Sequence, residues 1–376
     1  MPTGVDRVEL AYLDQMRRDV VPAFAVARTA LGLVLLDRSG MDALSGAIHG
    51  GAWGSVDLLS RLNPRLSIQA KQGQSFVRSK AMARSSRRRL SAMLARHMPR
   101  GFHYFNVGHS NLTQSVLQAI KAQTGSETHI LIHDTIPLDW PRFQRDGTEA
   151  AFEEKLRLTA SYADRVICTS IACLKDVQRH MRAMGRTPPM IPALLGVDMP
   201  VAGELPPKLQ PFSPYFVMVG TIEPRKNHAM ILDIWDKFDG DGPSLVICGA
   251  RGWNNASVFA RLDRGIAGVT EVADLSDGAI ATLLQGSKAL LFPSFAEGYG
   301  LPPVEAASLG VPVVCANLPA CGEIMGKTPV YLDPSDGYQW ENTILRLANE
   351  PTPHSDTKFV PPDWDSHFKL VFSEAS

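Results

Sequence analysis

The sequence has no apolar run long enough to cross a bilayer as a helix, which takes roughly 18–20 residues. Its first ten residues, MPTGVDRVEL, also lack the apolar core of a signal peptide. Only five cysteines are present and none forms a CxxC pair. Three of them (Cys168, Cys248 and Cys315) lie in apolar strand-like runs, where cysteine behaves as a small hydrophobe. We therefore expect a protein of the reducing cytoplasm.

Acidic residues are absent from positions 58–126, a span that contains twelve Lys or Arg. The whole chain carries 38 residues of each sign, so the remainder is about twelve charges negative. Within the basic span, 78–100 includes three consecutive arginines and suits an anionic membrane surface at the inner face of the plasma membrane. A solvated basic helix is the alternative. Nucleic acid attracts basic patches too, but we do not expect it because no motif for binding it accompanies the segment.

Length and composition indicate two globular domains. The 376 residues exceed one ordinary core, and 45% are hydrophobic and 20% charged. Short apolar runs alternate with longer amphipathic ones, which predicts parallel sheets covered by helices. Residues 199–214 contain five prolines and predict an extended linker. The expected units are a first domain over 1–198, a second over 215–350, and a tail over 351–376 with an amphipathic helix from about Trp364.

The first strand-to-helix junction of the second half suits a diphosphate. An apolar run ends at Gly220, and Arg225 and Lys226 come just before a helix expected to begin near Asn227. Ligands of open parallel sheets bind beyond the carboxyl ends of the strands. Helix N-termini and cations stabilise phosphate together at such places. Solvated loop charges are the alternative, but the position at a strand end favours a phosphate site.

The segment FAEGYGLPPVEAA holds two carboxylates around a glycine-rich bend. Its paired prolines suit the first turn of a helix, which would place Glu305 inside that turn. A carboxylate there can accept hydrogen bonds from two neighbouring ribose hydroxyls. Gly298 and Gly300 let the backbone approach a ligand closely, and Glu297 in the bend would face a reacting sugar. A plain helix-terminal charge is the alternative for Glu305.

These segments resemble those of a known family. FPSFAEGYGLPPVEAASLGVPVV resembles the E-x7-E signature of retaining, mannosyltransferase-like family 4 glycosyltransferases, and VGTIEPRKNH and GARGW resemble two further segments of that family. These matches span residues 215–333. PTGVDRVELAYL, LIHDTIP, ADRVICTS and LLGVD resemble its acceptor domain more weakly. The resemblance implies the α/β GT-B fold, with two doubly wound Rossmann-like domains, a cleft between them and a C-terminal helix that crosses back to the first domain.

The resemblance also implies roles on the donor side. Arg225 and Lys226 would hold the donor diphosphate, Glu305 the nucleotide ribose, and Glu297 the hydroxyls of the donor sugar. The backbone of the segment after Glu297 would reach the sugar and phosphate through Gly298, Tyr299, Gly300 and Leu301.

On the acceptor side, His133 matches a histidine beside the reacting anomeric carbon. From the residues alone, a structural histidine after a strand is the alternative reading of this position. Asp134 is its neighbour in the loop and could orient it.

Two positions depart from the family. Some relatives carry an arginine directly after the strand-ending glycine, where this chain has Thr221, so we do not expect Thr221 to bind phosphate. The family also has a first strand before the glycine loop, whereas Gly4 stands almost at the start of this sequence. We therefore expect either a start upstream of Met1 or a sheet without that strand, which leaves the role of Gly4 open.

The implied reaction moves a sugar from a nucleotide diphospho-sugar to a glycan or polyprenyl-linked acceptor with retention of configuration. It would serve envelope or exopolysaccharide synthesis, with GDP-mannose as the donor suggested by the resemblance. No DxD pair lies at a strand end, so we expect neither a metal nor another cofactor. The alternatives are a catalytically impaired sugar-nucleotide-binding protein and a sugar-nucleotide epimerase of the same fold, because fold alone does not decide function.

Overall fold

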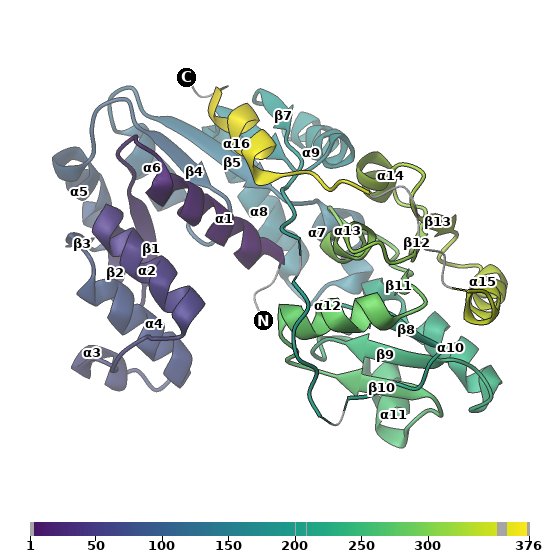
Figure 1. Cartoon of the computed structure of the whole chain (residues 1–376). Coiled ribbons are helices and arrows are strands. Elements are labelled where there is room, and N and C mark those ends of the chain that lie inside the picture. Colours follow the sequence, from purple (N-terminus) through teal and green to yellow (C-terminus); the bar gives the residue numbers. More distant parts are fainter. Residues whose placement is uncertain (1–3, 200, 208, 352–358, 374–376) are drawn as a thin grey trace.

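The computed structural model describes residues 4–199, 201–207, 209–351 and 359–373. The chain forms two α/β domains that lie side by side (Figure 1), as the sequence predicts. Among the described residues, no helix combines the length and the apolar character that crossing a bilayer would require.

The second domain is built on a six-stranded sheet in the order β10-β9-β8-β11-β12-β13. Every pair of neighbouring strands is parallel. Its strands are β8 (Tyr215–Val219), β9 (Ser244–Cys248), β10 (Val269–Val272), β11 (Leu290–Phe292), β12 (Val313–Ala316) and β13 (Val330–Leu332). The strand order reverses between β8 and β11, and ligands of doubly wound sheets bind at such a switch point.

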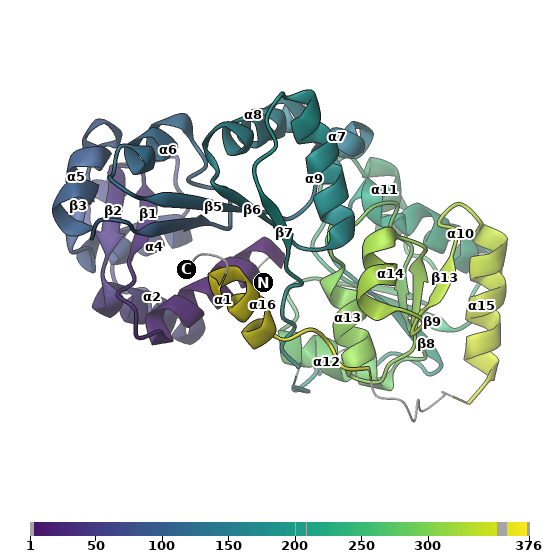
Figure 2. The same ribbon diagram turned by 90° about the horizontal axis from the view of Figure 1, so that it is seen from above.

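Helices cover both faces of this sheet (Figure 2). They are η3 (Pro224–Lys226), α10 (His228–Phe238), α11 (Ala256–Arg264), α12 (Asp277–Gly286), α13 (Leu301–Ser308), α14 (Pro319–Met325) and α15 (Gly337–Asn349). All residues of β11 and β12 are buried. Their continuous apolar sequence fits a sheet that is covered on both sides.

The first domain contains a four-stranded parallel sheet in the order β4-β5-β6-β7. Its strands are β4 (His103–Asn106), β5 (Glu127–Ile132), β6 (Arg165–Cys168) and β7 (Met190–Pro192). The helices of this domain are α1 (Gly4–Arg18), α2 (Arg38–Gly50), α3 (Leu58–Arg61), α4 (Ile68–Ser79), η1 (Arg87–Arg89), α5 (Leu90–His97), α6 (Gln114–Lys121), α7 (Ile136–Asp139), η2 (Pro141–Phe143), α8 (Thr148–Tyr162) and α9 (Ile171–Ala183).

A separate antiparallel sheet of β1 (Ala25–Thr29), β2 (Gly32–Leu36) and β3 (Ala83–Ser85) precedes the parallel one. The alternation of strands and helices predicted only parallel sheets, so this unit corrects that expectation. β1 and β2 form a hairpin at Gly32, whose φ of +127° is one that other residues rarely adopt. The first strand expected from the family would precede Gly4 and so falls outside the described residues.

The basic segment over 78–100 is not one solvated helix, contrary to that alternative. It includes β3, η1 and α5, which begin and end in quick succession. The guanidinium of Arg78 is buried and donates to Asp57 Oδ2 over 3.0 and 2.6 Å. The arginines of η1, by contrast, are exposed. Only part of this segment is therefore free to meet an anionic surface.

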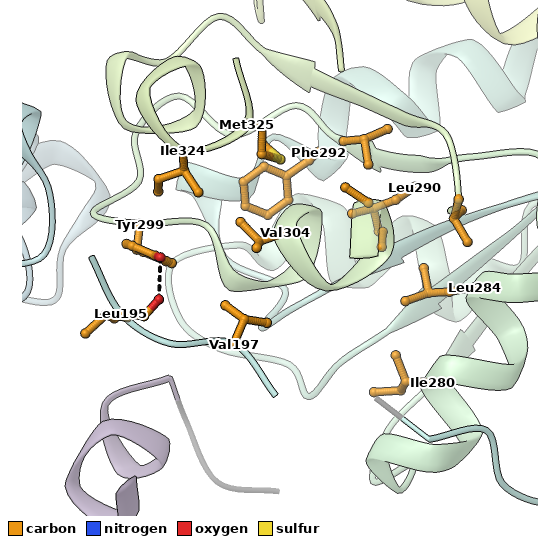
Figure 3. Packing of buried hydrophobic residues seen from close by; sticks show 14 of the residues in the cluster. Leu195, Val197, Ile280, Leu284, Leu290, Phe292, Tyr299, Val304, Ile324 and Met325 are labelled. Carbon is orange, nitrogen blue, oxygen red and sulfur yellow. Dashed lines mark hydrogen bonds between the residues drawn. The ribbon is translucent and has the colours of Figure 1, made fainter. Parts of the chain in front are cut away.

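The two domains share one hydrophobic cluster, which includes residues of β5, β8 and α13. Figure 3 shows part of this cluster, in which the hydroxyl of Tyr299 from the second domain donates to the Leu195 carbonyl of the first domain at 2.6 Å. The tail helix α16 (Trp364–Ser373) lies beside α1 of the first domain (Figure 2), which confirms the predicted crossover. The Tyr12 hydroxyl is 2.9 Å from His367 Nε2, and His367 Nδ1 donates to the Leu194 carbonyl at 2.9 Å.

Candidate active site

A cleft of about 440 Å³ lies between the domains, where the sequence placed it. On the second-domain side it is lined by the loops that follow β8 and β11 and by the start of α13. On the first-domain side it is lined by the loop after β5 and by the first turn of α1. The cleft therefore opens at the switch point between β8 and β11, beyond the carboxyl ends of the strands.

Arg225 and Lys226 meet Glu297 in this cleft. Arg225 Nη1 is 2.6 Å and Lys226 Nζ 2.7 Å from Glu297 Oε1, and all three side chains are at most 14% exposed. Arg225 Nη2 also contacts Glu223 Oε1 at 2.5 Å. Both cations lie in η3, just before α10, so the predicted position at a helix start is confirmed. The structure thus brings together three of the residues chosen from the sequence, and adds Glu223.

Glu297 and Arg225 hold each other in charged form, whereas burial acts against the charge of Lys226. Burial alone would raise the pKa of Glu297, but Arg225 and Lys226 bring it below its usual value. Burial would lower the pKa of Arg225, but Glu297 and Glu223 raise it instead. At Lys226 burial outweighs the carboxylates, so the ammonium pKa falls. The cluster is a preorganised pair of cations with a carboxylate between them.

Glu305 lines the same cleft but makes its ion pair with another residue. It is the fifth residue of α13 and so stands just beyond the first turn, one position later than predicted. It pairs with Arg7 of α1, which also contacts Asp277 at 2.9 Å. Burial raises the pKa of Glu305 more than Arg7 lowers it. Sequence reasoning missed Arg7, because nothing local shows that α1 reaches the second domain.

The segment after Glu297 runs directly against the first domain. A side chain added at Gly298 would overlap the carbonyl oxygen of His133, so only glycine permits this approach. Gly300 has a φ of +91° and precedes α13. The segment from Gly298 to Leu301 lines the cleft, and the Tyr299 hydroxyl within it anchors the first domain at the Leu195 carbonyl.

His133 lines the cleft on the first-domain side. Its Nε2 donates to the Val107 carbonyl at 2.7 Å, which leaves Nδ1 without a proton. Burial lowers the pKa of His133. Burial raises the pKa of Asp134, which favours the neutral form of this carboxyl group. Asp134 Oδ1 accepts from the Ile136 amide at 3.0 Å, and among the described residues no hydrogen bond joins its carboxylate to the His133 ring.

A second contact between the domains involves GARGW, the segment at 249–253. Trp253 Nε1 donates to the Phe143 carbonyl at 2.9 Å, and Asn254 Nδ2 to the Gln144 carbonyl at 2.9 Å. The Phe143 ring stacks on Phe295 with centroids 5.4 Å apart. This contact between the domains was not predicted, although a tryptophan shortly after a strand is a signal that could have indicated it.

Part of the chain is similar in sequence to known proteins. Residues 206–358 match the family described as "Glycosyl transferases group 1". The "Serotype-specific mannosyltransferase WbdA" of Escherichia coli is 32% identical over 237 residues, which cover 56% of this chain and 29% of that protein. The "O-antigen chain mannosyltransferase B" of Escherichia coli is 30% identical over 189 residues, covering 49% and 45%. The chain thus spans less than half the length of these relatives.

Solved structures show the fold. Anabaena Alr3699/HepE in complex with UDP-glucose superimposes with a TM-score of 0.54 at 15% identity, covering 77% of each chain. TarM superimposes with a TM-score of 0.52 at 14% identity, covering 73% of this chain and 53% of that one. Both are GT-B proteins. The chain therefore has the GT-B fold and carries, over residues 206–358, a region that matches the group 1 glycosyl transferases.

Proposed function

We propose that this protein is a retaining glycosyltransferase that uses a nucleotide diphospho-sugar. The observation that carries the proposal is the buried cluster of Arg225, Lys226 and Glu297 at the switch point of the second sheet. Two cations at a strand end suit a diphosphate, and a carboxylate beside them suits sugar hydroxyls. The group 1 match covers this whole cluster and Glu305, whose carboxylate suits the ribose.

In the proposed reaction the bond between the anomeric carbon and the diphosphate breaks, and a bond to the acceptor oxygen forms on the same face. The proton of the acceptor hydroxyl passes to the departing diphosphate oxygen. Arg225 and Lys226 stabilise the charge that develops on that diphosphate, so the step needs neither a metal ion nor another cofactor. Neutral His133 offers hydrogen bonding beside the anomeric carbon without adding a charge there.

Mannose is the proposed donor sugar, with GDP as its nucleotide. The support is that several relatives are named as mannosyltransferases of O-antigen chains. The acceptor would then be a growing envelope or exopolysaccharide glycan, free or polyprenyl-linked. A smaller pocket of about 160 Å³ continues past Glu297 and Gly298 and is lined by Trp140 and Asp176. An aromatic ring with nearby carboxylates suits a pyranose of this acceptor.

We also propose that the first domain contacts an anionic lipid surface from the cytoplasmic side. The exposed arginines of η1 support this, since basic residues near a surface attract anionic lipid. Sedimentation with phosphatidylglycerol vesicles, and not with phosphatidylcholine vesicles, is the expected result. Replacing Arg87, Arg88 and Arg89 together by Gln should abolish it, and retained binding would contradict this part of the proposal.

Calorimetry with GDP, UDP, dTDP and ADP tests the proposal most directly. One of these nucleoside diphosphates should bind. The double variant Arg225→Ala, Lys226→Ala should weaken its binding more than it weakens binding of the corresponding nucleoside, which has no phosphate. Transfer is then assayed with the sugars of the nucleotide that binds. Binding without transfer or donor hydrolysis would favour an impaired binding protein. Interconversion of free sugar nucleotides would favour an epimerase, and no binding at millimolar nucleotide would contradict a donor site.

A further inference from the structure

Two histidines and a glutamate gather on the first domain, away from the cleft. His103 Nδ1 lies 3.0 Å from His129 Nε2, and both nitrogens lie 3.6 Å from Glu127 Oε2. All three ligand atoms are within 4.8 Å of one another. Nothing in the proposed glycosyl transfer uses these residues.

Strand pairing explains why the three side chains meet. His103 is opposite Glu127, and Phe105 is opposite His129, in the parallel ladder of β4 and β5. Residues two apart on a strand share a face, so His103, Glu127 and His129 project from the same face of the sheet. They stand at the beginnings of their strands, whereas the cleft lies beyond the carboxyl ends.

The spacing suits a single metal ion. With metal–ligand distances of about 2.1 Å, a nitrogen pair 3.0 Å apart subtends about 90° at the ion, and each nitrogen–oxygen pair 3.6 Å apart about 120°. The three angles sum to less than a full circle, so the ion would lie above the plane of its ligands. At least one coordination position would then stay open to water.

The alternative to a metal ion is a hydrogen bond between the two imidazoles, but this alternative does not explain the position of Glu127. One shared proton satisfies the two nitrogens, but leaves the carboxylate at 3.6 Å, beyond hydrogen-bond distance. His129 is 1% exposed, and its other nitrogen, Nδ1, has no hydrogen-bond partner. Its ring stacks on Phe105 with centroids 4.7 Å apart. The polar contacts of this buried ring are therefore directed through Nε2 toward the cluster.

Nearby charge also permits a cation. Asp164 and Arg165, at the start of β6, carry one charge of each sign, and both act electrostatically on His129. Lys121 contacts Asp164 at 2.6 Å. The carboxylate of Glu127 supplies the negative charge closest to the two nitrogens.

We propose that His103, Glu127 and His129 bind one divalent transition-metal ion, of which Zn²⁺ is the representative. Imidazole nitrogens select such ions over Mg²⁺ and Ca²⁺, which prefer all-oxygen sites. The bound ion joins the beginnings of β4 and β5, so its role is to stabilise the first domain.

Calorimetric titration of the chelator-treated full chain with ZnCl₂ tests the proposal. One equivalent should bind, and His103→Ala and Glu127→Gln should each weaken it at least tenfold. Both side chains are partly exposed, so these variants should fold. His49→Ala, an exposed histidine on α2, is the matched control and should bind as the wild type does.

Wild-type protein alone gives a second readout. Its Co²⁺ form should show paramagnetically shifted proton resonances from two coordinated imidazoles, and its unfolding temperature should rise with Zn²⁺ but not with Mg²⁺. No binding by the wild type, equal binding by His103→Ala, or a Co²⁺ spectrum without two imidazoles would each overturn the proposal. The metal site and the donor site are separate, so the result of this test does not depend on whether GDP binds.

Discussion

The two walls of the cleft carry polar groups in opposite states. On the second domain, the pKa of Glu297 is lowered and that of Arg225 is raised, because each group stabilises the charge of the other. On the first domain, burial lowers the pKa of His133 and raises that of Asp134, which favours the neutral form of both. The pair of Glu297 and Arg225 is thus built to hold charge, whereas His133 and Asp134 on the facing wall favour their neutral forms.

This difference matches what each wall would meet in glycosyl transfer. A diphosphate gains negative charge as it departs, and preorganised cations stabilise that charge without reorganising. A sugar and an acceptor hydroxyl are neutral, and neutral donors and acceptors can hold them without a competing ion pair. The predictions below alter one wall at a time.

The largest effect is expected at the charged wall. Glu297→Gln leaves Arg225 and Lys226 buried without their shared counter-ion, which should lower the free energy of unfolding by about 3 kcal/mol. Transfer should fall at least 100-fold. Chemical denaturation and a donor-turnover assay measure the two effects. Glu350→Gln, at an exposed ion pair of the same domain, is the control and should change neither. Unchanged stability of Glu297→Gln would show that this cluster is not held together by charge.

Glu305→Ala should weaken nucleotide binding about 10- to 100-fold, since hydrogen bonds to a charged group are worth about 1.5–3 kcal/mol. The contact is assigned to the ribose, so the wild type should prefer the ribonucleotide over its 2′-deoxy form, and the variant should not. Calorimetry with both nucleotides checks this. A variant that keeps the preference would place the ribose elsewhere.

Acid should also act on two buried neutral histidines outside the lining of the cleft. Burial lowers the pKa values of His109 and His367 to about 4, below the usual 6.5. Between those values the unfolded chain binds more protons, so stability falls as pH decreases from about 6.5 toward 4. Each histidine should contribute up to about 1.4 kcal/mol per pH unit. Denaturation at pH 7 and pH 5 measures the slope. His367→Gln should flatten it, and an equal slope in this variant would be inconsistent with the prediction.

The smallest effect is expected at Arg7, the link between the walls. Its ion pairs are partly exposed, so Arg7→Ala should cost less than about 1 kcal/mol of stability. Nucleotide binding should tighten a few-fold, because the ribose no longer competes with Arg7 for Glu305. Weaker binding, measured by the same calorimetry, would instead mean that Arg7 itself holds the nucleotide.

The sequence predicted most of the second domain because its signals there are local. Apolar strands, the cations before α10 and the glycines beside Glu297 each act within a few residues, and the structure places them as expected. Contacts between the domains could not be predicted in this way. Arg7 meets Glu305 across 298 residues, and Trp253 meets Phe143 across 110. Pairings of this kind depend on how the domains pack.

The first domain was harder to predict for a second reason. The hairpin of β1 and β2 has an antiparallel partner in β3, nearly fifty residues later in the chain. Charge pattern was also misleading, since Arg78 belongs to the basic segment but is buried against Asp57. The residues His103, Glu127 and His129 gave no signal, because only the register of β4 against β5 brings them together.

The chain passes between the domains twice, and the two passages touch. The Val197 amide donates to the Pro362 carbonyl at 2.9 Å, and a side chain at Gly196 would overlap Trp364. Both covalent connections therefore cross between the domains at the same place. Because the two connections are bound to each other there, a relative rotation of the domains would be centred on this point.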